Sequence, residues 1–75
     1  MNQIDICLNS TQDAVDFVKC VDQYSCSMDL CCGSCVVDAK SIMGVLGMAV
    51  GKKSRLCIYE DCVDEIVTGV KAFMA

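Results

Sequence analysis

The 75-residue sequence contains no histidine, and this absence narrows the metal sites that it can form. Zinc sites commonly combine cysteine with histidine, so the absence of histidine argues against zinc, although a site made of four cysteines stays open. Basic residues are also few, since six lysines and arginines stand against ten aspartates and glutamates, for a net charge of -4. Binding to a phosphate backbone requires a basic surface, so this composition argues against nucleic acid as a partner.

Long apolar runs are missing as well. The longest run, Ile42 to Val50, is far shorter than the roughly 20 residues that a membrane-spanning helix needs, so we expect no membrane insertion. No basic residue precedes an apolar run near the N-terminus, so the sequence predicts no signal peptide and a cytoplasmic location. No catalytic triad, pair of acids or phosphate-binding glycine loop is recognisable. We therefore expect a protein that is not an enzyme and needs no cofactor.

The residues that are present predict a single domain, 1–75, of the α+β class. Apolar residues alternate with polar ones in four segments and recur at helical spacing in three others, in the order βαββαβα. The expected strands are Ile4–Leu8, Cys26–Cys32, Cys35–Ala39 and Leu56–Ile58. The expected helices run from Ser10 to about Gln23, from Ser41 to the stop signal at Gly51, and from an Asp61 cap through Met74.

The Gly33-Ser34 turn joins two of these strands in a hairpin, so at least one strand pair is antiparallel. Each strand has one apolar and one polar face. This pattern favours an antiparallel sheet that helices cover on one side, but it leaves the order of the strands open.

The short segment after Ala39 is the most informative in the chain. Ser41 is a natural N-cap, because its hydroxyl can accept a hydrogen bond from a free amide in the following turn. Apolar residues then occupy more than one side of a helix of about two turns, which indicates either deep burial or a face offered to a partner.

The segment Lys40–Leu46, KSIMGVL, closely resembles the regulatory segment of HPr, the histidine-containing phosphocarrier of the bacterial sugar phosphotransferase system. The resemblance is specific over Val37–Lys53 and weaker from Phe17 to Ala75. It implies an open-faced sandwich in which three helices cover one face of a four-stranded antiparallel sheet, with strand order 1-4-2-3.

The resemblance also implies roles for single residues. The serine that matches Ser41 is phosphorylated in this family by a dedicated kinase. The apolar residues that match Ile42, Met43 and Leu46 form the docking patch for protein partners. The expected partners are therefore HPr kinase or a regulator of the phosphotransferase system, and the expected state is a monomer or weak dimer.

The histidine that carries phosphate in the family has no counterpart here. Matching the two sequences at Phe17 places Ser10 at the histidine position, Gln12 at an arginine and Asp13 at a proline. A serine phosphoester is too stable to pass its phosphate on easily, and Asp13 would repel an incoming phosphoryl group. We therefore expect Ser10 and Thr11 to be helix caps and the carrier activity to be lost, as in the family's regulatory paralogues with glutamine at this position. A relocated phosphate acceptor at Ser10 or Thr11 is the alternative.

Of the eight cysteines, six fall on expected strands and divide between the two faces of the sheet. Cys26, Cys32 and Cys35 are in phase with core residues, whereas Cys7, Cys31 and Cys57 fall on the opposite face of the sheet. Cys20 lies on the first helix, and Cys62 lies in the first turn of the last one.

These cysteines have two interpretations. In the first they serve as small apolar residues that stay reduced in the cytosol. In the second, Cys31, Cys32 and Cys35, with Cys57, form a redox or metal site. A single tetrahedral site is awkward because Cys31 and Cys32 point to opposite faces, but Cys32 and Cys35 could approach each other across the hairpin.

Overall fold

A computed structural model describes residues 2–59 and 63–74. Its elements, in chain order, are β1 (Asn2–Cys7), α1 (Thr11–Val21), β2 (Met28–Cys32), β3 (Cys35–Asp38), α2 (Ile42–Met48), β4 (Lys53–Ile58), α3 (Val63–Val70) and a short 3-10 helix (Lys71–Phe73). The predicted βαββαβα order is confirmed. The Asp61 cap and Cys62 lie outside the described residues.

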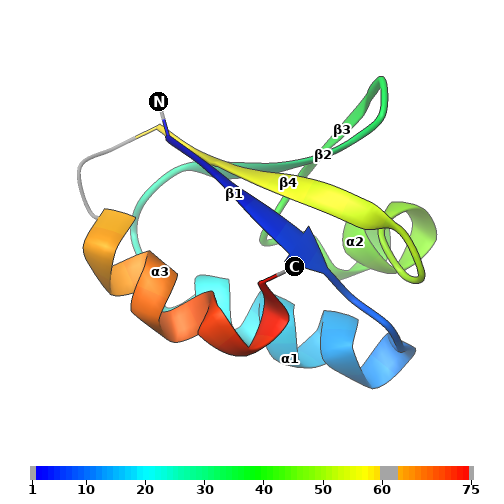
Figure 1. Ribbon diagram of the computed structural model, residues 1–75, viewed down its shortest axis with the longest axis horizontal. Helices are drawn as coiled ribbons and strands as arrows, with labels where there is room; N and C mark the ends of the chain where they lie inside the picture. Colours follow the sequence, from blue (N-terminus) through cyan, green and yellow to red (C-terminus); the bar gives the residue numbers. More distant parts are fainter. Residues whose placement is uncertain (1, 60–62, 75) are drawn as a thin grey trace.

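The four strands form one antiparallel sheet in the order β1-β4-β2-β3, as the family resemblance implies. The three α-helices cover one face of this sheet and leave the other face open (Figure 1). The fold is therefore the expected α+β open-faced sandwich.

The hydrophobic core lies between the sheet and the helices. Strands β1, β2 and β4 contribute alternate residues, and each helix contributes one apolar stripe, as the two periodicities predict. The largest fully buried side chains are Ile6, Leu8, Phe17, Val21, Leu30, Val45, Leu56, Ile58, Ile66 and Val70. Phe17 of α1 also meets Phe73 edge-on, with ring centroids 5.7 Å apart, which fixes the chain end against α1.

Several predicted boundaries were wrong. Strand β4 begins at Lys53, three residues before the predicted start at Leu56, because its first half alternates exposed charges with the buried Ser54 instead of apolar residues. The last helix changes to a 3-10 turn after Val70, so Met74 leaves the buried stripe and is 43% exposed. Over residues 2–59 and 63–74, no helix has the length and apolar character required to cross a membrane.

Candidate functional site

Side chains at the start of α1 accept hydrogen bonds from backbone amides there. Ser10 is the N-cap, and its Oγ accepts a hydrogen bond of 3.1 Å from the backbone amide of Asp13. The Asp13 carboxylate in turn accepts a hydrogen bond of 3.2 Å from the amide of Asn9. This reciprocal arrangement resembles a capping box. A carboxylate therefore lies beside the helix end where an incoming anion would otherwise find free amides.

The two residues after the cap are exposed. Thr11 opens the helix, and the Gln12 side-chain amide donates a hydrogen bond of 2.9 Å to the Asp16 carboxylate. Ser10, Thr11 and Gln12, the three residues predicted as a degenerate phosphocarrier position, thus lie together at the N-terminal end of α1. Their hydroxyl and amide groups lack the nucleophilic nitrogen that a histidine would supply.

This end of α1 lies beside the C-terminal end of α2. Leu8 forms a bridge with Val50, and the Gly51 amide donates a hydrogen bond of 2.7 Å to the Leu8 carbonyl. Gly51 has φ of +78°, a left-handed conformation that glycine adopts without strain, so the predicted stop at this residue has a physical basis.

Ser41 caps the other end of α2. Its Oγ accepts a hydrogen bond from the Gly44 amide at 3.4 Å, which confirms the predicted cap. Its own amide donates to the Asp38 carbonyl at 3.0 Å, so the residue is held on both sides. The side chain is nevertheless exposed, so its hydroxyl is accessible from solvent.

The apolar residues of α2 divide between core and surface. Val45 is fully buried, whereas Met43 is 83% exposed and Ile42 is 36% exposed. Leu46 is half-buried and packs against the core. Of the two alternatives that the sequence left open, the helix therefore presents an apolar face to solvent, formed by Ile42, Met43 and the exposed part of Leu46.

Two of the predicted thiols come together on the open face of the sheet. The sulfurs of Cys31 on β2 and Cys57 on β4 lie 3.3 Å apart. Cys57 is only 3% exposed although it lies on the open face. Burial, followed by the hydrogen bond and negative charge of Cys31 and the charge of Asp29, raises the pKa of the Cys57 thiol to about 11, although the charge of Arg55 acts in the opposite direction.

The other cysteines are distributed more widely. Cys32 and Cys35 are register partners across the hairpin, as predicted, but Cys32 Sγ is directed at the Lys53 carbonyl at 3.8 Å and Cys35 is exposed. Cys35 shares the face of Leu30 and Cys32, as predicted, but it is exposed because β3 is the edge strand. Cys26 is buried as predicted and takes part in a disulfide bond.

No metal site is assembled in the part of the chain that the structure describes. Within residues 2–59 and 63–74, no group of three or more histidine, cysteine, aspartate or glutamate side chains is placed to hold an ion. Cys20 is also separate, since its thiol donates to the Gly69 carbonyl at 3.1 Å and burial raises its pKa.

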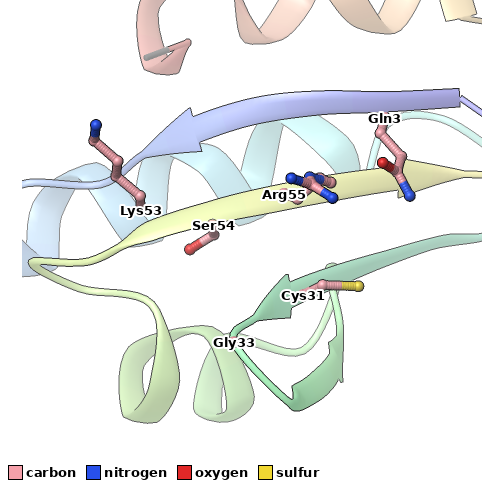
Figure 2. A pocket seen from close by; sticks show the side chains of 6 residues that line it. All are labelled: Gln3, Cys31, Gly33, Lys53, Ser54 and Arg55. Carbon is pink, nitrogen blue, oxygen red and sulfur yellow. The ribbon is translucent and has the colours of Figure 1, made fainter.

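Two neighbours of the thiol pair were not predicted from the sequence. The Tyr59 hydroxyl donates a hydrogen bond of 2.9 Å to the Asp29 carboxylate, next to Cys57. The second neighbour is a pocket of about 290 Å³ that lies beside Cys31, between β4 and the hairpin (Figure 2). Only strand register places these residues together, since Tyr59 and Asp29 are 30 positions apart in the chain.

Comparison with known proteins identifies the family. The family model described as "PTS HPr component phosphorylation site" matches residues 10–75. The chain therefore belongs to the HPr family of the phosphotransferase system, as its Ser41 segment predicted. A search of curated protein sequences found no match.

Solved structures of HPr proteins share this fold. HPr-C-His from Thermoanaerobacter tengcongensis is 25% identical with a TM-score of 0.77, and the alignment covers 96% of this chain and 89% of that one. The histidine-containing phosphocarrier protein of Mycoplasma is 14% identical, with a TM-score of 0.76 over 95% of this chain and 89% of that chain. HPr from Bacillus anthracis is 18% identical, with a TM-score of 0.75 over 99% and 96%. The last two likenesses concern the fold alone.

Proposed function

We propose that this HPr-family protein is a regulatory protein-interaction module that has lost phosphocarrier activity. It docks partners through Ile42, Met43 and Leu46, and phosphorylation of Ser41 controls that docking. The partners are HPr kinase or a regulator of the phosphotransferase system, and the process is the control of sugar transport in a bacterial cytoplasm. The protein acts as a single domain, a monomer or weak dimer, without enzyme activity of its own.

The observation that carries this proposal is an exposed N-cap serine followed at once by exposed apolar residues. Met43 gains little from folding because 83% of its surface stays in water, so burial in the core does not explain its side chain. An exposed apolar group next to an accessible hydroxyl fits a kinase that must dock before it phosphorylates. Leu46 supports the same surface from its half-buried position.

Three features support the loss of carrier activity. The chain has no histidine. The residue at the family's phosphate-carrying position, Ser10, uses its hydroxyl as a helix cap. The Asp13 carboxylate already accepts a hydrogen bond at the same helix end, so it would repel a phosphoryl group arriving there.

Phosphorylation of Ser41 would change the docking surface by charge. A phosphoserine carries about -1.5 to -2 charges at pH 7. This charge would lie next to Ile42 and Met43, at the helix end where negative charge is favoured. A partner with an acidic rim would be repelled and one with an arginine cluster would be attracted, while the fold stays intact.

The proposal is tested by treating the protein with an HPr kinase and ATP and locating the phosphate by mass spectrometry. We expect incorporation at Ser41 in the wild type and none in Ser41→Ala. Met43→Asp should strongly reduce incorporation, because it places a charge on the docking surface at a position too exposed to affect folding. Leu46→Asp should reduce it too, although this half-buried residue also contributes to stability.

Val36→Asp is the matched control. Val36 is 60% exposed, but it lies on β3 outside the proposed surface, so its variant should be phosphorylated like the wild type. Equal incorporation in Met43→Asp and Val36→Asp would keep the phosphorylation site but remove α2 as its docking surface. No incorporation in the wild type would leave Ser41 as a cap and nothing more.

A separate reaction tests the alternative that the protein still carries phosphate on a residue other than histidine. The protein is incubated with phosphoenolpyruvate and the first enzyme of the phosphotransferase system, and its mass is measured. We expect no added phosphate. A phosphate on Ser10 or Thr11 would contradict the loss of carrier activity.

A further inference from the structure

The contact between Cys31 and Cys57 follows from the register of β2 and β4. Asp29 pairs with Cys57 and Cys31 pairs with Arg55, so the two cysteines are diagonal neighbours on the same face of adjacent strands. Their sulfurs are 3.3 Å apart. A disulfide bond is about 2.05 Å long, so bond formation needs an approach of roughly 1.2 Å.

The pocket beside this pair lies where the two strands separate. Pairing between β2 and β4 ends at Cys31 and Arg55, while the hairpin continues to Cys32. Figure 2 shows Cys31 and Gly33 on the hairpin side of the pocket, with Lys53, Ser54 and Arg55 along β4. Gln3 of β1 completes the lining.

The lining of this pocket is suited to an anionic ligand. Lys53 and Arg55 contribute two cationic side chains, of which Arg55 also lies 3.7 Å from the Asp5 carboxylate in an exposed ion pair. Ser54 is only 6% exposed, and its Oγ has no hydrogen-bond partner among the described residues. Register pairs Ser54 with the buried Ile6, on the face opposite Lys53 and Arg55, so the preference for an anion rests on the two cationic side chains.

The two thiols are not equivalent. Cys31 lines the pocket and is half-buried, so a reagent in the pocket can reach its sulfur. Cys57 is almost fully buried, and its sulfur contacts that of Cys31. Cys31 is therefore placed to react first and Cys57 second.

We propose that Cys31 and Cys57 form a reversible disulfide by exchange with a low-molecular-weight disulfide that bears carboxylate groups and binds in this pocket. In the first step the Cys31 thiolate attacks one sulfur of the reagent, giving a mixed disulfide and releasing one reagent thiol. In the second step Cys57 loses its proton and attacks the Cys31 sulfur, releasing the other reagent thiol. Two protein thiols are oxidised to one disulfide, and one reagent disulfide is reduced to two thiols.

The diagonal geometry makes this disulfide easy to reduce. Diagonal neighbours on antiparallel strands have α-carbons about 7–8 Å apart, near or beyond the limit that a relaxed disulfide spans. Closing the bond therefore strains the two strands, and strained disulfides have the more oxidising potentials typical of reversible sites. This site is separate from the Ser41 surface, so the proposed disulfide can be tested independently of the proposed function.

The test is to incubate the reduced protein with oxidised glutathione, block the remaining thiols by alkylation, and map the cysteines by mass spectrometry. We expect a Cys31–Cys57 disulfide, release of two glutathione molecules for each one formed, and full reversal by dithiothreitol. Cys57→Ala should stop after the first step and retain one glutathione on Cys31. Cys31→Ala should lose the reaction at Cys57, because that thiol is buried.

Cys32→Ala is the matched control, since Cys32 lies next to Cys31 but directs its sulfur to the Lys53 carbonyl. It should react like the wild type. Thiols at Cys31 and Cys57 that stay free for alkylation after oxidation would overturn the proposal. So would the absence of glutathione from Cys31 in Cys57→Ala, whatever the exposed Cys35 carries.

The charge of the reagent tests the role of the pocket. Oxidised glutathione is negatively charged at neutral pH and cystamine is positively charged, so we expect faster reaction with glutathione at low salt. Replacing Lys53 and Arg55 together by glutamate should reverse this preference, whereas the exposed Lys71→Glu outside the pocket should not. Equal rates for the two reagents in the wild type would remove the anionic preference from the proposal.

Discussion

Replacing Ser41 with alanine separates the two roles assigned to this residue, because the cap contributes to stability whether or not the hydroxyl is ever phosphorylated. The substitution removes the hydrogen bond from the Gly44 amide to Ser41 Oγ. The Gly44 amide then donates its hydrogen bond to water, since the helix end is exposed. Ser41→Asp is the companion variant, because it keeps an acceptor and adds a negative charge at the favourable helix end.

The geometry sets the size of the effect. N-cap replacements by alanine cost about 0.5–2 kcal/mol, and the bond at Ser41 is long, at 3.4 Å, so we expect the low end, about 0.5 kcal/mol. The cap at Ser10 is shorter, at 3.1 Å, and Asp13 reinforces it, so Ser10→Ala should cost about 1 kcal/mol. For a domain of this size these values correspond to falls in melting temperature of roughly 2–4 °C and 4–8 °C.

The measurement is thermal and urea unfolding, followed by circular dichroism, of wild type, Ser41→Ala, Ser41→Asp and Ser10→Ala under identical redox conditions. Ser41→Asp should melt at or above the wild-type temperature. A Ser41→Ala variant that melts with the wild type would show that the 3.4 Å contact contributes nothing. A larger loss at Ser41 than at Ser10 would refute the use of hydrogen-bond geometry to rank the two caps.

Two further predictions concern packing and ionisation. Gly47→Ala should stabilise the protein by about 0.5–1 kcal/mol, because an added Cβ meets nothing within 4 Å, whereas Gly69→Ala should destabilise it by placing a Cβ 2.5 Å from the Tyr24 hydroxyl. Urea unfolding of both variants checks this, and a gain at Gly69 would show that Tyr24 moves aside freely. The hydrogen bond to Asp29 raises the pKa of Tyr59 to about 12, so the stability it contributes is fully present below pH 10 and is lost as the pH rises through 12. Asp29→Asn should lower this pKa in a spectrophotometric titration, and an unchanged value would mean that Asp29 is not the cause.

The order of helices and strands could be predicted because the apolar periodicity and the capping residues indicate the same elements. Alternation placed Ile4, Ile6 and Leu8 toward the helices, and all three are buried. Capping residues located the starts of α1 and α2, because a Ser side chain can satisfy a free amide that apolar residues leave open. The order of the strands in the sheet could not be predicted in this way, because no local preference of the chain encodes it. Here it was predicted from the resemblance to HPr.

The start of β4 shows where local reasoning fails. Lys53 and Arg55 are exposed and Ser54 is buried, so the period-2 pattern is present, but its buried member is polar. A search for apolar alternation passes over such a strand. The same residue, Ser54, is among those that line the pocket beside Cys31, between the exposed Lys53 and Arg55.

The thiol pair shows a more general limit. Alternation predicted that Cys31 and Cys57 share the open face, and the structure agrees. The face of a strand depends on parity alone, whereas the identity of a neighbour across strands depends on register. Sliding β2 by two residues along β4, so that Asp29 paired with Arg55, would keep every side chain on its present face and would bring Asp29 to the place of Cys31. The hydrophobic pattern would be unchanged and the thiol contact would be lost. Chemistry that needs two strands is therefore specified by the pairing of Asp29 with Cys57 and Cys31 with Arg55, which no single segment of the chain reveals.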